Sequence, residues 1–102
     1  QPYYDSETTI AGKVNVSSKT FTVTVQGPSS VTKVKMEATL YQKKLIGREE
    51  ISTMSASSNS ARCSKSQSAA IEKGKTYVIE VTAQVYSGGA WDTIEETITV
   101  KT

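Results

Sequence analysis

Side chains that could carry covalent catalysis are scarce in this sequence. Its 102 residues contain no histidine, which excludes the Ser-His-Asp and Cys-His arrangements of nucleophilic catalysis. A Ser-Lys dyad stays open, although no spacing singles out one such pair. The acid pairs Glu49-Glu50 and Glu95-Glu96 lie in segments predicted as strands, where adjacent side chains point to opposite faces and do not converge on one substrate. We therefore expect a protein without enzymatic activity.

Metal ligands are equally scarce. The chain has no histidine and a single cysteine, Cys63, and the acids Asp5, Glu7 and Asp92 do not have the spacing of a calcium-binding loop. A lone cysteine cannot form an internal disulfide, so we interpret Cys63 as a small apolar side chain of a sheet rather than a reactive thiol. We expect neither a metal nor a cofactor.

An aromatic pair, Tyr86 and Trp91, is the best candidate for a binding feature. If the two residues face each other across a hairpin, both rings lie on the solvent side of the sheet, where Lys33 and Lys35 of a neighbouring strand can lie over them. We favour the interpretation that the pair stabilises its own hairpin, by about 0.2–1 kcal/mol. A surface for a protein or a glycan is the alternative. That candidate surface consists of Tyr86, Trp91, Lys33, Lys35, Gly88 and Gly89.

β-Strands are predicted to position these residues, because apolar and polar side chains alternate along most of the chain. Val34, Met36 and Ala38, for example, alternate with lysine and glutamate. Strands are expected at residues 8–17, 20–26, 31–43, 77–86 and 91–101, with a short strand around Ile51 and a weak strand leading to Ile71. The serine-rich residues 55–68 are expected to begin as a loop. Residues 1–7 are predicted to be a flexible lead-in, and residues 8–102 a single domain.

The last two strands are predicted to form a hairpin whose loop is the four residues Ser87-Gly88-Gly89-Ala90. Pairing Tyr86 with Trp91 sets a register in which both faces are consistent. The inner pairs are then Ala83 with Ile94, Ile79 with Ile98 and Tyr77 with Val100, and the outer pairs are Gln84 with Thr93 and Glu80 with Thr97. Glu96 falls inward opposite Val81, where an unpaired carboxylate is unfavourable. We predict that a β-bulge rotates it outward, and a partnered inward acid is the alternative.

The residues before the first of these strands indicate the kind of sheet protein. The motif Ile71-x-x-Gly74-x-x-Tyr77, followed by an alternating strand, resembles the E–F corner and F strand of fibronectin type III and related immunoglobulin-like domains. In those domains the tyrosine hydroxyl returns to the backbone just upstream, and here we expect it to find an acceptor in the bend at Gly74. The chain differs from the family pattern in having Lys73 at the usual proline and no tryptophan in its early strands.

This resemblance implies an all-β fold, an immunoglobulin-like, fibronectin type III-like antiparallel β-sandwich of about seven strands. Ile71, Gly74 and Tyr77 are then structural residues of its corner. The chain is also similar, in a general way, to small Ser/Thr-rich secreted domains of Gram-positive bacteria that have no assigned activity.

Composition limits the partners. Twelve basic and ten acidic residues are spread along the chain with no run longer than a pair, which argues against nucleic-acid binding. No apolar run is long enough for a transmembrane segment, so we expect no membrane insertion. Serine and threonine make up more than a quarter of the residues, a composition that suits exposed sheet. We expect a secreted or cell-surface protein.

The expected function is that of a non-catalytic extracellular module, either a structural spacer or a domain that interacts with a protein or a cell-surface glycan. The alternative is a small secreted inhibitor that presents residues 27–30 and 87–91 to a hydrolase. The sequence shows no inhibitor loop motif.

Overall fold

The computed structural model describes residues 8–102, which form seven antiparallel β-strands and contain no helix. The strands are β1 (Thr9–Asn15), β2 (Thr20–Gln26), β3 (Val31–Lys43), β4 (Arg48–Ser58), β5 (Arg62–Ser68), β6 (Thr76–Ser87) and β7 (Ala90–Lys101). The predicted flexible lead-in, residues 1–7, lies outside the described residues.

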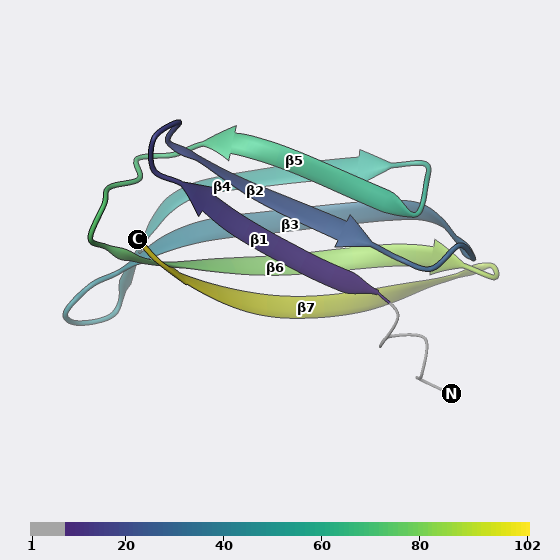
Figure 1. The fold of residues 1–102 in the computed structure, drawn as a ribbon. Helices are drawn as coiled ribbons and strands as arrows, with labels where there is room; N and C mark the ends of the chain where they lie inside the picture. Colours follow the sequence, from purple (N-terminus) through teal and green to yellow (C-terminus); the bar gives the residue numbers. More distant parts are fainter. Residues whose placement is uncertain (1–7) are drawn as a thin grey trace.

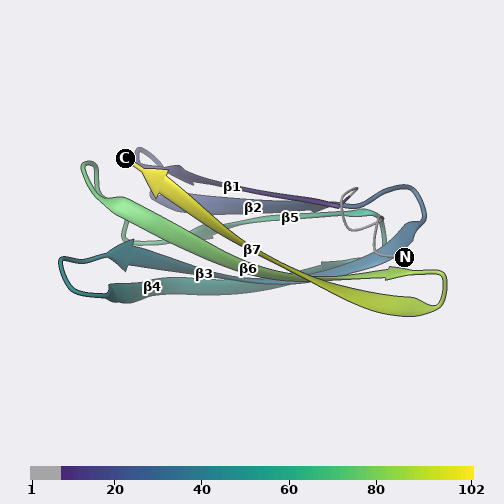
Figure 2. The same ribbon diagram turned by 90° about the horizontal axis from the view of Figure 1, so that it is seen from below.

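Within residues 8–102 the strands make two sheets, one in the order β1-β2-β5 and the other in the order β4-β3-β6-β7. Figure 1 shows the two layers one behind the other, and Figure 2 shows them edge-on. The all-β fold class expected from the alternating sequence is therefore confirmed, in an arrangement compatible with a β-sandwich.

The core lies between the layers because each inner strand places every second side chain there. In β2, Phe21, Val23 and Val25 are completely buried and the threonines between them are half-buried. The central strands β3 and β6 supply most of the opposite wall. Their inward residues are Val34, Met36, Ala38 and Leu40 from β3 and Tyr77, Ile79, Val81, Ala83 and Val85 from β6, as the alternation predicts.

The corner motif closes one end of the core. Tyr77 and Ile71 are completely buried, and Gly74 has φ +86°, a conformation that L side chains rarely adopt. The tyrosine hydroxyl accepts a hydrogen bond of 2.7 Å from the backbone N–H of Glu72. The sequence predicts a backbone acceptor for this hydroxyl, whereas the recorded bond has a backbone donor. A phenol oxygen can accept as well as donate, so the corner forms with the bond in this direction.

The segment predicted as a short strand and a loop is instead the 11-residue strand β4. It pairs with β3 along its whole length, but the register shifts between Leu40 and Tyr41, so that Ile51 is an extra residue. This irregularity breaks the alternation of apolar residues that a sequence pattern depends on. The serines that suggested a loop lie on the strand, where backbone pairing rather than apolar periodicity holds them.

The final hairpin has the predicted register, including the pair Tyr86–Trp91 and all five further predicted pairs. The prediction of a four-residue loop is wrong, because Ser87 pairs with Ala90 and leaves only Gly88 and Gly89 in the turn. Both glycines have positive φ, +62° and +83°, which is what a two-residue turn between twisted strands requires.

The predicted bulge at Glu96 is also wrong. β6 and β7 pair without a register shift, and Glu96 lies opposite Val81 yet is exposed. β7 is an edge strand of its sheet, and its inner side borders an open hollow next to Thr9 and Ile10 of β1. The carboxylate therefore meets water without any distortion of the strand.

Candidate functional site

The sequence-predicted surface residues come together on the outer face of the four-stranded sheet. Lys33 Nζ lies 5.4 Å from the centre of the Tyr86 ring, and Lys35 Nζ lies 4.7 Å from the centre of the Trp91 ring. The two ring centres are 5.1 Å apart, with the ring planes inclined by 54°. Lysine and aromatic side chains thus interleave, and we call Lys33, Lys35, Tyr86 and Trp91 the aromatic ridge.

Strand pairing explains why the ridge forms. In the register of β3 with β6, Lys33 is opposite Tyr86, and in the register of β6 with β7, Tyr86 is opposite Trp91. Directly opposed side chains in an antiparallel pair lie on one face and within contact distance. The Gly88-Gly89 turn fixes this register, but an added Cβ at either glycine would meet nothing within 4 Å. The glycines therefore position the ridge without lining it.

The two rings differ in how much they are exposed. Tyr86 is half-buried, whereas Trp91 is 41% exposed and is one of the large apolar side chains that residues 8–102 leave in solvent. Aromatic packing of this kind contributes to the stability of the hairpin. It also leaves indole surface that a ligand can cover.

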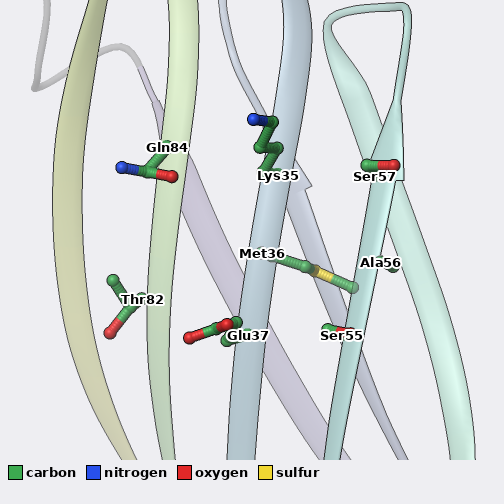
Figure 3. Close-up of a pocket in the computed structure, with 8 residues that line it drawn as sticks. All are labelled: Lys35, Met36, Glu37, Ser55, Ala56, Ser57, Thr82 and Gln84. Carbon is green, nitrogen blue, oxygen red and sulfur yellow. The ribbon is translucent and has the colours of Figure 1, made fainter.

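A shallow hollow of about 520 Å³ adjoins the ridge on the same outer face (Figure 3). It has the form of two rows across three strands, Ser57–Lys35–Gln84 and Ser55–Glu37–Thr82. Met36 and Ala56, which point to the core side of their strands, complete its lining. Lys35 and Gln84 are the side chains that connect the hollow with the ridge.

The hollow is polar. Figure 3 shows Lys35 and Glu37 on β3, with Thr82 and Gln84 on one side and the two serines on the other. These side chains offer an ammonium group, a carboxylate, an amide and three hydroxyl groups, so donors and acceptors alternate within a small area. The floor is low on the β4 side because serine is small. Such a surface can form several hydrogen bonds to a ligand that itself carries many hydroxyl groups.

The hollow was not predicted from the sequence. Glu37, Gln84 and Thr82 have outward positions in strands that were predicted, but Ser55 and Ser57 lie in a segment predicted as a loop. The two serines are two residues apart in the sequence, and side chains of a strand return to the same face at every second residue. This spacing could have predicted that both lie on one face of a strand.

The other predicted features lie away from this surface. Ile71, Gly74 and Tyr77 are at the opposite end of the sheet, where they close the core. Cys63 is buried in β5, as predicted, and burial raises the pKa of its thiol, which keeps it in the protonated, less reactive form. Among residues 8–102, no buried side-chain nitrogen or oxygen lacks a hydrogen-bond partner, so the core offers no polar atom to a ligand.

Residues 8–102 contain neither a candidate metal site nor a candidate membrane-spanning helix. No group of three or more histidine, cysteine, aspartate or glutamate side chains is arranged to hold a metal ion. The described part of the chain also has no helix with the length and apolar character needed to cross a membrane.

Comparison with known proteins gives no match to this sequence or fold, whether with protein families, with curated proteins or with solved structures. The class that the structure itself defines is an all-β protein of two antiparallel sheets.

Proposed function

We propose that this chain is a non-catalytic, immunoglobulin-like module of a secreted or cell-surface protein, and that it binds a glycan on the outer face of its four-stranded sheet. The fibronectin type III-like variant is supported by two features. β4 pairs with β3 instead of joining the sheet of β1, β2 and β5, unlike the fourth strand of a constant-type immunoglobulin domain. The buried Tyr77 also bonds to the backbone of Glu72, just upstream, as in a tyrosine corner.

The observation that carries the binding proposal is the position of the aromatic ridge beside the polar hollow. A sugar ring has apolar C–H faces and a rim of hydroxyl groups. The exposed part of Trp91 suits the first, and Glu37, Gln84 and the serine hydroxyls suit the second. Concave sites with a few converging polar groups are the usual form of ligand sites.

The outer face suits a glycan better than a large protein partner. Apart from the ridge and Met36, the side chains around the hollow are polar or small. Protein interfaces generally have a well-packed, mostly apolar centre, and this surface offers only the aromatic pair for that purpose.

The inhibitor alternative has less structural support. It requires residues 27–30 and 87–91 to project a segment into an enzyme cleft, but β6 and β7 are joined by a two-residue turn. A turn of this length leaves no extended stretch of backbone for an enzyme to hold.

A glycan array with the purified chain tests the proposal, followed by calorimetry with any glycan that binds. We expect Trp91→Ala and Gln84→Ala to reduce affinity about tenfold or more, since each removes a contact to the bound sugar. Thr97→Ala, an exposed residue on the outer face of β7 farther from the hollow, is the matched control and should bind as the wild type does. Absence of binding to any glycan, or equal binding by Trp91→Ala, would reject the proposal.

A further inference from the structure

The loop between β3 and β4 leaves two aliphatic side chains almost fully exposed. Leu45 is 102% exposed and Ile46 is 90% exposed, although apolar residues make up only 36% of the sequence and Leu45 is one of two leucines. Apolar side chains as exposed as these contribute little to folding, and together they form a small apolar patch. We call residues 44–47 the hairpin tip. In Figures 1 and 2 this loop projects beyond the ends of the neighbouring strands.

The structure holds the hairpin tip in one shape. Lys43 pairs with Arg48 at its base, the Lys44 N–H donates a 3.0 Å hydrogen bond to the Gly47 carbonyl, and Gly47 has φ +73°. Lys44 also forms an ion pair with Glu49 at 3.0 Å. The two aliphatic side chains are therefore presented by a closed turn, with little conformational entropy left to lose on binding.

Arg48 fastens the base of the hairpin tip to the sheet. Its guanidinium carbon lies 3.9 Å from the centre of the Tyr41 ring, and the same group forms a 2.9 Å ion pair with Glu80 of β6. Stacking and pairing together fix the strand that leads out of the tip. The tip is thus anchored on both its strands.

Basic residues gather around the hairpin tip. The β5–β6 loop and the end of β7 lie at the same end of the molecule (Figure 1). Seven cationic residues lie at this end, Lys19, Lys43, Lys44, Arg48, Lys73, Lys75 and Lys101, and all are exposed. Four acids accompany them, Glu49, Glu50, Glu72 and Glu80. The described side chains at this end therefore have a formal charge of +3.

We propose that the hairpin tip docks this end of the molecule onto an anionic lipid surface, with Leu45 and Ile46 in the interfacial layer and the surrounding lysines on the lipid headgroups. The tip is convex and its apolar part is only two side chains, which is far less than the centre of a stable protein interface. The cations are spread over several segments, and this arrangement matches a diffuse negative surface better than a single pocket.

Such docking is distinct from spanning a bilayer, because only two side chains leave water. It is also independent of the glycan proposal. The hairpin tip and the aromatic ridge lie at opposite ends of the four-stranded sheet and share no residue.

Sedimentation with vesicles tests this inference. We expect the wild-type chain to bind phosphatidylcholine vesicles that contain phosphatidylglycerol, to bind vesicles of phosphatidylcholine alone much more weakly, and to be released by added salt. The double variant Leu45→Ser, Ile46→Ser should lower partitioning about tenfold or more. Lys73→Gln and Lys75→Gln, in a different loop, should each lower it roughly fivefold.

The matched control is the exchange Leu45→Ile, Ile46→Leu, which keeps the apolar surface and should bind as the wild type does. Equal unfolding midpoints for all variants establish that each is folded. A second readout reports depth: in a Trp91→Phe background, the single indole of Ile46→Trp should shift its fluorescence to shorter wavelength on anionic vesicles.

Three outcomes would overturn the inference. They are absence of wild-type binding to anionic vesicles, equal binding by the double serine variant, and no fluorescence shift despite sedimentation. The first outcome would mean that the tip binds a pocket of another protein instead of a lipid surface. The other two would mean that charge alone adsorbs the protein.

Discussion

Two hairpins of the four-stranded sheet place apolar side chains in solvent at opposite ends of the molecule, and they do so in different ways. In the β6–β7 hairpin, Trp91 is 41% exposed and packs on Tyr86 beneath Lys35. In the β3–β4 hairpin, Leu45 and Ile46 are almost fully exposed. Both turns rely on glycines with positive φ, so the difference lies in the side chains.

This difference separates apolar residues that serve the fold from those that do not. Cross-strand contacts give Trp91 a structural role whether or not it binds a ligand. No comparable contact accounts for Leu45 and Ile46, and this exposure is the basis of the proposed docking of the hairpin tip. The comparison can be tested by stability measurements on both hairpins.

The largest effect is expected from the β6–β7 turn. Changing both Gly88 and Gly89 to alanine should lower the free energy of unfolding by about 2–4 kcal/mol, since each alanine must adopt positive φ at about 1–2 kcal/mol. Gly88→Asn is the control and should have little effect, because asparagine tolerates this conformation. Chemical denaturation measures both. A double alanine variant as stable as the wild type would show that the turn does not hold the register.

The second-largest effect on stability is expected from the Tyr77 corner, at the other end of the sheet. Tyr77→Phe keeps the buried ring but leaves the Glu72 N–H without its recorded acceptor, and should lower the free energy of unfolding by about 1–3 kcal/mol. Tyr86→Phe, on the outer face, should change it by less than about 0.5 kcal/mol. If the two variants have the same unfolding midpoint in denaturant, the corner bond makes no net contribution.

The aromatic ridge should show a smaller effect. Trp91→Ala removes the ring contact with Tyr86 and the cation–π contact with Lys35, and we expect a loss of about 1–2 kcal/mol. A double-mutant cycle with Lys35→Ala measures the share due to the lysine. A coupling energy of zero would mean that Lys35 lies over the ring without stabilising it.

The hairpin tip should show the smallest effect. Leu45→Ser, Ile46→Ser should change the free energy of unfolding by less than about 0.5 kcal/mol, because neither side chain is buried. A thermal melt of this variant beside Trp91→Ala tests the comparison directly. A loss of unfolding free energy as large as that of Trp91→Ala would show that the tip has a structural role. The two hairpins would then not differ in the way described.

Much of the sheet is predictable because its strands alternate strictly. β2 and β3 have the bounds expected from their sequences, and the pairing of β6 with β7 follows from matching their apolar faces. β4 was predicted poorly, since the shift at Ile51 and its many serines remove the alternation. The ridge was therefore predictable from β3, β6 and β7, while the hollow beside it needed the position of β4.

Exposure was the least predictable property. Leucine and isoleucine are residue types usually found in a core, and only the closed turn at Gly47 shows that Leu45 and Ile46 face water. Glu96 occupies a position that the register turns inward, and only the openness of the sandwich beside β7 shows that it is solvated. In both cases the exposure of a side chain depends on which segment of the chain lies opposite it. A local sequence pattern does not contain that information.

By itself the amino-acid sequence determined the fold class, the faces of the alternating strands, the Tyr77 corner and the register of the last hairpin. These depend on local periodicity and on backbone preferences of single residues, which are properties of neighbouring positions in the chain. The tertiary structure alone decided which strand lies beside β3, where the polar hollow opens and which apolar side chains remain uncovered. Those depend on contacts between segments far apart in sequence, and packing selects among them only when the two sheets come together.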